Sequence, residues 1–288
     1  FQNAGLSIFV IGFVIFNLTL AEVNGRKLYT DYSKFFILQK IFFVLISLGL
    51  FQVIGPEGIL IGYGLSYIPF FKRMYISLRT NNFNFKFLKE KSGFIANNYS
   101  LDMVSAVGGQ IDKLMIVPLF GFGLLGNYYL GLQVVSMLGI IPGVIFTYIL
   151  PQDASGSSTK KLRMLTILSS VILAILGVFL APILIPIVFP EYEESLTLIP
   201  ILSISIIPGT ITSMYTSKFL GKEKSLYVLI GYLISAAALV LGILTLSEIF
   251  GIIGLAFAYV GSMSLQAIFL VIMNYFKRDI FREKMNHE

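Results

Sequence analysis

Four ionisable side chains lie well inside long apolar runs, and they are the residues with which this chain could do chemistry within a membrane: Lys40, Asp102, Asp112 and Lys113. A charge in the hydrocarbon core costs about 3 kcal/mol on insertion scales, so such residues usually face a bundle interior or a water-filled cavity. With the neighbouring Gln110, they are our candidates for lining a polar cavity. An ammonium there would attract anions, whereas a carboxylate such as Asp102 could hold a proton or a cation.

The spacing of these residues limits which of them can act together. Asp102 and Lys113 share one face of a helix, about three turns apart, because each residue advances the helix by about 100°. Asp112 and Lys113 are adjacent and point about 100° apart, which predicts that they do not form a simple pair. Asp112 could instead orient Lys113 or hold a neighbouring helix.

A purely structural role is the alternative for both lysines. Lys113 lies shortly before Pro118, where a long side chain can extend to the outer membrane interface. Lys40 lies close to the opposite boundary of its run and can reach the interface in the same way. Neither residue would then contact a ligand.

Composition excludes several kinds of chemistry. The chain has no Cys, so it has no disulfide, no thiolate metal site and no Cys nucleophile, and its single His, His287, lies next to the C-terminus. The loops expected outside are only a few residues long and leave no room for a catalytic domain. We therefore expect no enzymatic activity, no catalytic residues, no cofactor and no metal site.

Nine long apolar runs carry the candidate residues, and most of them are long enough to cross a hydrocarbon core about 30 Å thick. With 56% hydrophobic and 12% charged residues, the chain lies far outside the amino-acid composition that is usual for soluble proteins. The sequence predicts an all-α integral membrane protein with nine transmembrane helices, at residues 1–20, 35–54, 58–78, 93–118, 124–150, 164–189, 195–217, 225–247 and 252–275.

Apart from Lys40 and Lys113, the Lys and Arg residues fall into clusters at alternate ends of these runs, at 26–34, 72–91, 160–163, 218–224 and 277–284. Cytoplasmic loops retain Lys and Arg, so the pattern predicts a multi-pass protein of the cell membrane with a cytoplasmic C-terminus. The basic residues behind the net charge of +6 would then lie beside the anionic inner leaflet of the membrane. We expect membrane lipids, and no nucleic acid, as partners.

Two short blocks recur at a constant offset of 196 residues. Gly25-Arg26 matches Gly221-Lys222, and Gly55-x-x-Gly58 matches Gly251-x-x-Gly254 where an outer loop opens a helix. Small residues allow tight turns and close helix contacts there. Such a repeat is typical of transporters built from two parallel halves, although small residues also recur by chance in membrane helices.

The repeat predicts two lobes of six helices, of which this chain would hold nine helices in all. Residues 1–78 would be the last three helices of the N-terminal lobe, and 79–91 a basic cytoplasmic linker. Residues 92–277 would form a complete C-terminal lobe, and 278–288 a cytoplasmic tail. The three opening helices, about 105 residues, would precede the first residue of this chain.

Three segments resemble the seventh-to-eighth helix region of the polysaccharide flippases. They are Asn97-Asn98-Tyr99-Ser100, Gln110-Ile111-Asp112-Lys113 and Gly126-Asn127-Tyr128-Tyr129. That family carries an Asp-Lys or Asp-Arg pair on one helix and a Gly-x-Tyr-Tyr or Gly-x-Tyr-Ser entry to the next. The resemblance extends over essentially the whole chain, apart from the absent opening helices. The flippases belong to the MOP superfamily, which also holds the MATE drug exporters and the peptidoglycan-precursor flippases.

The resemblance implies two six-helix lobes around a central cavity that opens alternately to either side. It also implies a transporter that moves a lipid-linked oligosaccharide or polysaccharide precursor across the cytoplasmic membrane by alternating access. The sugar head would pass through the cavity, with Lys113 attracting the pyrophosphate, while the polyprenyl tail stays in the bilayer. A coupling ion, H⁺ or Na⁺, is a further candidate partner. Two alternatives stay open. A MATE-like exporter of cationic compounds would need acidic residues in the cavity, and a non-transporting scaffold or assembly protein has little need of buried charges.

Overall fold

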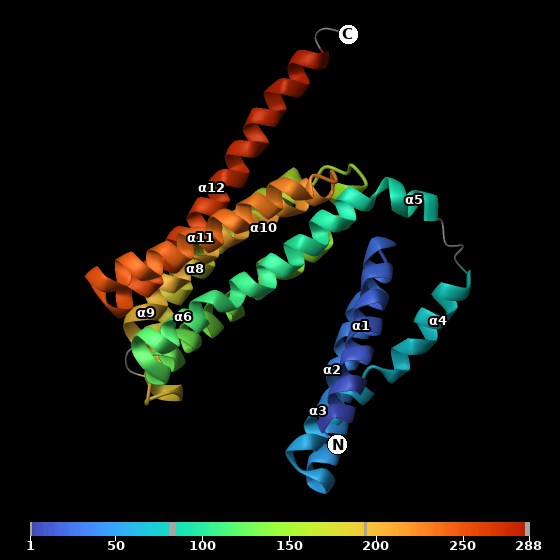
Figure 1. Ribbon diagram of the computed structural model, residues 1–288, viewed down its shortest axis with the longest axis horizontal. Coiled ribbons are helices and arrows are strands. Elements are labelled where there is room, and N and C mark those ends of the chain that lie inside the picture. The colour runs from blue at the N-terminus through green and yellow to red at the C-terminus, as the bar shows by residue number, and fades with distance from the viewer. Residues whose placement is uncertain (1, 81–84, 193–194, 286–288) are drawn as a thin grey trace. The chain divides into compact units, whose positions relative to one another are not determined.

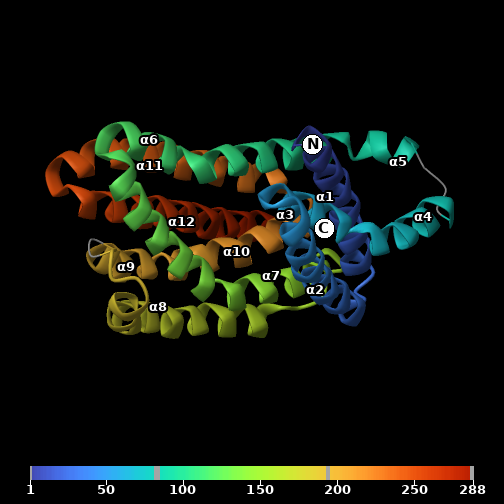
Figure 2. The same cartoon turned by 90° about the horizontal axis from the view of Figure 1, so that it is seen from below.

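The computed structural model describes residues 2–80, 85–192 and 195–285, and every regular element in these ranges is helical (Figures 1 and 2). The predicted linker 79–91 and tail 278–288 lie partly outside these ranges. The elements are α1 (Gln2–Gly25), α2 (Tyr29–Ile54), α3 (Pro56–Leu65), the 3₁₀ helix η1 (Ile68–Phe70), α4 (Phe71–Thr80), α5 (Phe85–Glu90), α6 (Ser92–Leu138), α7 (Ile140–Ala154), α8 (Lys160–Val188), α9 (Ser195–Ile204), α10 (Ile206–Leu220), α11 (Ser225–Phe250) and α12 (Ile252–Met285).

The chain divides into two compact units, Phe1–Lys89 and Glu90–Glu288. The boundary falls within the basic segment 79–91 that the sequence places between two lobes. In the second unit, α12 packs between α11 and α10, as Figure 2 shows. The assignment of the two units to lobes of a twelve-helix protein stays a prediction.

Seven helical stretches among the described residues are long and apolar enough to cross a membrane. Most of them coincide with one predicted run each. The stretch Ser92–Leu138 instead holds the run 93–118 and much of the run 124–150. These two runs are separated at Gly121, whose φ of 82° and ψ of 177° interrupt the helix where the sequence predicts an outer loop.

Three of the nine predicted runs are not continuous helices in the structure. The run 58–78 breaks after α3, the run 124–150 breaks at Gly139, and the run 195–217 breaks at Ser205. As a result, the segment 58–78 contains no membrane-length helix.

Proline explains where these breaks occur. Pro69, Pro142 and Pro208 each lie in the first turn of the helix that follows a break. The first N–H groups of a helix have no partner within the helix, so a residue that lacks an N–H is tolerated there. In contrast, α8 continues through Pro182 and Pro186 as one helix.

The repeat at an offset of 196 residues is also present in the backbone. Helices α2 and α11, which follow the first block, contain 26 residues each. Lys27 and Glu223, the only non-glycine residues with positive φ among those described, have φ values of 59° and 57°. Gly55 and Gly251 end the two helices with φ values of 71° and 58°. The two helix–turn–helix units therefore have matching local structure.

The second glycine of each repeat block allows a close approach between helices. A Cβ on Gly58 would lie 2.5 Å from the carbonyl oxygen of Leu50, and one on Gly254 would lie 2.1 Å from that of Leu246. Both distances are too short for any side chain. The sequence expectation that small residues serve close helix contacts is confirmed at both positions.

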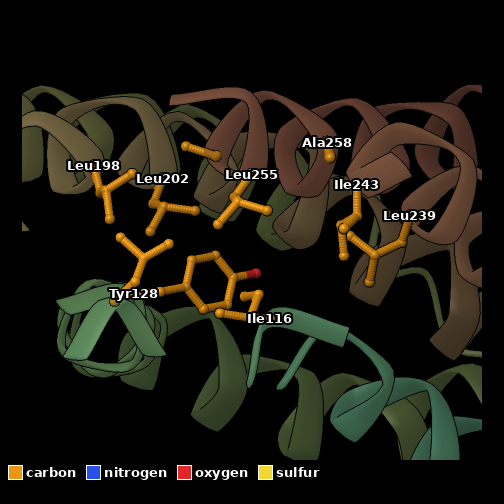
Figure 3. Packing of buried hydrophobic residues seen from close by; sticks show 10 residues of the cluster. Ile116, Tyr128, Leu198, Leu202, Leu239, Ile243, Leu255 and Ala258 are labelled. Atoms are coloured by element: carbon orange, nitrogen blue, oxygen red, sulfur yellow. The ribbon is translucent and has the colours of Figure 1, made fainter. Parts of the chain in front are cut away.

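A buried cluster joins α6, α9, α11 and α12 in the second unit (Figure 3). Tyr128 lies at its centre and is fully buried, together with Ile116, Leu198, Leu202 and Leu255. Many other large apolar side chains are exposed; on α8, Ile187 is 75% exposed and Phe179 is 70% exposed. Such surfaces suit a protein whose solvent is lipid.

Candidate functional site

A polar cavity of about 530 Å³ lies in the second unit between α6, α11 and α12. Three of the predicted residues line it: Gln110, Asp112 and Lys113. Their part of α6 also contributes Gly108 and Gly109, where the space that a Cβ would occupy is open. The other polar residues of the lining are Ser105, Tyr129, Gln133, Ser136, Tyr232, Ser235, Tyr259, Ser262 and Gln266.

Asp112 is held by contacts from both sides of the interruption in α6. Its side chain is buried, and the residue is only 3% exposed. The Tyr128 hydroxyl donates a hydrogen bond to Oδ2 at 3.1 Å, and the Lys113 backbone N–H donates one to Oδ1 at 2.8 Å. Because Tyr128 follows Gly121 and Asp112 precedes it, the carboxylate ties the two halves of α6 together.

Lys113 Nζ lies 3.7 Å from Asp112 Oδ1, so the prediction that the adjacent residues do not pair is wrong. The long lysine side chain folds back along its own helix and brings the ammonium to a carboxylate that its Cβ direction does not face. Nζ also donates a hydrogen bond to the Gly109 carbonyl oxygen at 2.6 Å. That carbonyl lies one turn farther from Pro118, so in this structure the ammonium does not extend toward the Pro118 end of the helix.

The other two predicted residues do not line this cavity. Asp102 is exposed on α6, just before the lining residues Val104 and Ser105. Lys40 is exposed on α2, in the other compact unit, where Nζ lies 5.6 Å from the ring centroids of both Phe36 and Tyr63. An ammonium over aromatic faces is stabilised without a ligand.

The cavity is also lined by Gln266 and Tyr232, which were not among the residues predicted from the sequence. Gln266 is 1% exposed, and its Nε2 has no hydrogen-bond partner. A glutamine in an otherwise apolar run is a visible signal, because an amide in hydrocarbon is costly, but the sequence does not show which helix it faces. Among the described residues, no group of three or more His, Cys, Asp or Glu side chains could hold a metal ion.

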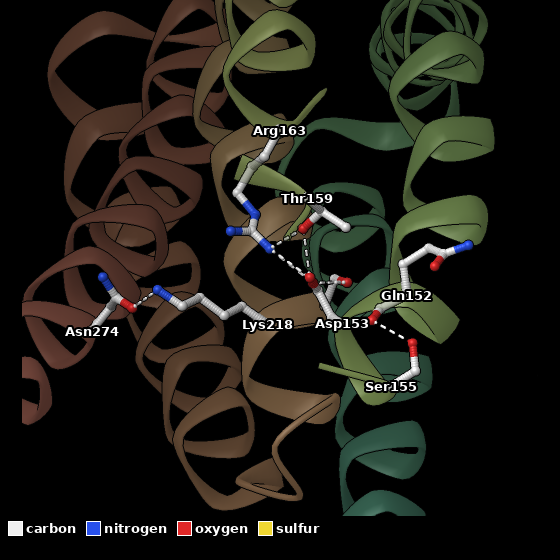
Figure 4. Close-up of polar contacts among 8 residues, drawn as sticks. Gln152, Asp153, Ser155, Thr159, Arg163, Lys218 and Asn274 are labelled. Carbon is white, nitrogen blue, oxygen red and sulfur yellow. Dashed lines mark hydrogen bonds and ion pairs between the residues drawn. The ribbon is translucent and has the colours of Figure 1, made fainter. Parts of the chain in front are cut away.

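A second buried ionic cluster joins the ends of α7, α8 and α10 (Figure 4). Arg163 Nη2 donates to both carboxylate oxygens of Asp153, at 3.0 and 2.8 Å. Thr159 and Ser217 donate their hydroxyls to the same carboxylate at 2.6 and 2.7 Å. The charge pattern of the sequence places Arg163 among the orienting residues, and the structure adds a packing role for it.

Comparison with known proteins shows the fold. No family model matches the chain, and no curated protein matches it. A solved structure of a MATE in the bent conformation matches with a TM-score of 0.79 and 10% sequence identity. The match covers 97% of this chain and 69% of that protein. The chain therefore has the fold of a MATE, an all-α, multi-pass membrane architecture.

Proposed function

We propose that this chain is part of a transporter that moves a lipid-linked oligosaccharide or polysaccharide precursor across the cytoplasmic membrane by alternating access, driven by H⁺ or Na⁺. The fold shared with a MATE supports transport as the general activity. The observation that supports an anionic substrate is the ion pair of Asp112 and Lys113 in the polar cavity.

The two partners of this pair are not equally accessible. The Asp112 side chain is 4% exposed, whereas the Lys113 side chain is 24% exposed. The carboxylate already accepts hydrogen bonds from Tyr128 and from the Lys113 backbone, while an ammonium has three donors. The accessible side of the pair is therefore positive, which favours a phosphate or pyrophosphate over a cation.

A MATE-like exporter of cationic compounds is the second candidate, and the structural match to a MATE favours it. Such an exporter needs an accessible acid, and Asp102 is the exposed carboxylate on α6. In the flippase proposal Asp102 serves at most the coupling ion. A pure scaffold fits least, because it would gain nothing from a polar cavity with an unpartnered buried amide.

The test is transport by full-length protein in proteoliposomes, with a lipid-linked oligosaccharide or a lipophilic cation as the probe. We expect Lys113→Gln to lower oligosaccharide transport at least about tenfold, since about 1.4 kcal/mol of attraction to a diphosphate is enough for that change. Lys113→Arg should retain part of the activity, because the charge stays while the geometry changes.

Lys160→Gln is the matched control, because Lys160 is exposed at the start of α8 and outside the cavity. It should transport normally, and all variants should reach the membrane in equal amounts. Unchanged oligosaccharide transport by Lys113→Gln would contradict the role of this residue. Transport of the cation alone, abolished in Asp102→Asn, would support the exporter instead.

A further inference from the structure

A pocket of about 440 Å³ lies within the first compact unit, and nothing in the proposed function accounts for it. The end of α1, the start of α2, η1 and the first turns of α4 surround it. The three cations of its lining come from the basic clusters 26–34 and 72–91, which the charge pattern predicts to lie at the cytoplasmic surface of the membrane. The charged residues that line the pocket are Glu22, Arg26, Lys72 and Arg73.

The acidic residues at the pocket do not balance its three cations. Glu22 is shared between both arginines, since Oε1 lies 2.6 Å from Arg26 Nε and Oε2 lies 3.2 Å from Arg73 Nε. Arg73 Nη1 also lies 3.6 Å from Asp31 Oδ2. The Lys72 side chain is exposed and pairs with no carboxylate in the described part of the chain. One positive charge of the pocket is therefore uncompensated.

The two arginines also keep hydrogen-bond donors for a further acceptor. A guanidinium has more N–H groups than one carboxylate oxygen can accept, and the nearest contact of each arginine is with a different oxygen of Glu22. The Arg26 side chain is 55% exposed and that of Arg73 is 32% exposed, so both are accessible. An anion that enters the pocket can therefore be bound by an ammonium and by guanidinium N–H groups together.

The internal repeat indicates that these charges are not needed to build the helices. At the offset of 196 residues, Lys72 and Arg73 correspond to the apolar Ile268 and Phe269 of α12. Membrane orientation does not depend on Lys72 either, because four more basic residues follow in the same cluster, between 79 and 91. The charges of the pocket are therefore available for a ligand.

The rest of the lining limits the chemical class of the anion. It is apolar and consists of Phe35, Pro69 and Ile76. Arg73 Cζ lies 5.5 Å from the ring centroid of Phe35, so a cation and an apolar wall lie directly beside each other. Ile76 is 50% exposed and its neighbour Tyr75 is 65% exposed, which gives α4 an apolar surface next to the cations. A molecule with a phosphate at one end and an apolar body matches both parts of the lining.

We propose that this pocket binds the phosphate head group of an anionic phospholipid from the inner leaflet. Lys72 supplies the uncompensated charge, the arginines supply further donors, and Phe35 and Ile76 lie beside the glycerol and the start of the acyl chains. Basic pockets between helices on the cytoplasmic side are typical sites for acidic lipid head groups. The bound lipid belongs to the bilayer and is not transported, so the proposal does not depend on the transported substrate.

Native mass spectrometry of the full-length protein in detergent tests the proposal, with dioleoyl phosphatidylglycerol and dioleoyl phosphatidylcholine as probes. We expect Lys72→Gln to weaken binding of the first phosphatidylglycerol about fivefold, which is typical for one basic residue near anionic lipid. Lys72→Arg should retain the binding, because the charge is kept. The matched control is Lys34→Gln, because Lys34 is also exposed and lies next to Phe35 on α2, but does not line the pocket. Its affinity should equal that of the parent.

Three results would overturn the lipid site. Equal binding of the two lipids would show that the phosphate charge is not recognised. Equal losses in Lys72→Gln and Lys34→Gln would show diffuse attraction to a basic surface. An excess of inorganic phosphate should leave phosphatidylglycerol bound, because free phosphate gains nothing from the apolar wall, and displacement would assign the pocket to a soluble anion instead. Since Lys72 has no carboxylate partner, Lys72→Gln should melt at the temperature of the parent.

Discussion

At the scale of single residues, Asp112 shows how an ionised group can be kept inside a membrane protein. Three contacts compensate its charge before any ligand arrives, from the Tyr128 hydroxyl, the Lys113 N–H and the Lys113 ammonium. The cost of burying the carboxylate is thereby reduced, and the cation of the pair is left facing the cavity. The carboxylate positions the lysine, and the lysine is the group expected to meet the substrate.

This arrangement predicts a large effect for a small change at Tyr128. Tyr128→Phe removes one hydrogen bond and leaves Asp112 Oδ2 without that donor in a buried site. We expect a loss of about 2 kcal/mol of stability, because hydrogen bonds to charged groups contribute about 1.5–3 kcal/mol. Thermal unfolding in detergent measures it. Tyr129→Phe, at an exposed neighbour, should change stability by less than about 0.5 kcal/mol. Equal melting temperatures for the two variants would contradict the prediction.

At the scale of elements, the repeated helix–turn–helix predicts paired effects at equivalent glycines. Gly58→Ala and Gly254→Ala each place a methyl group against backbone atoms that cannot move aside easily. Both should be destabilised by about 1–3 kcal/mol, the usual cost of overpacking. Gly49→Ala is the control, because its Cβ would meet no atom within 4 Å. If only one of the two repeat positions is sensitive to alanine in a detergent melting assay, the structural equivalence is wrong.

The cluster around Asp153 predicts strong coupling between α7 and α8. Asp153→Asn and Arg163→Gln should each destabilise the protein by about 3–5 kcal/mol, because each leaves a buried charge without its partner. The double variant should lose less than the sum of the single variants. Melting temperatures of all four proteins, with exposed Glu248→Gln as a control, give the coupling. Additive losses would show that the ion pair contributes nothing beyond its separate residues.

The elements also show what a sequence can and cannot predict. Runs of apolar residues locate helices well, and the glycines of the repeat locate its turns, because both signals are local. The pairing of Asp112 with Lys113 does not follow from helix geometry, because the flexible Lys113 side chain folds back along its own helix. The direction of the Lys113 Cβ alone does not predict where the ammonium lies. Gln266 and Arg163 were missed as interior residues, since their partners come from other helices and sequence spacing does not reveal those neighbours.

At the scale of the whole molecule, the sequence predicts the orientation in the membrane, and the fold by itself does not determine it. Helix α8 connects two chemically different ends. It begins at Lys160 in a basic cluster and ends near Glu191, in a segment without Lys or Arg. Because basic residues stay in the cytoplasm, we expect the α8 N-terminus inside and residue 191 outside.

Single-cysteine labelling in intact cells tests this orientation without background, since the chain has no Cys. Glu191→Cys and Lys160→Cys are both at exposed positions near opposite ends of α8. A membrane-impermeant maleimide should label Glu191→Cys in intact cells, and should label Lys160→Cys only after permeabilisation. Removing one charge from a cluster that keeps Lys161 and Arg163 should not invert the protein. The reverse labelling pattern would overturn the topology and place the C-terminus, which the same charge pattern assigns to the cytoplasm, on the outside.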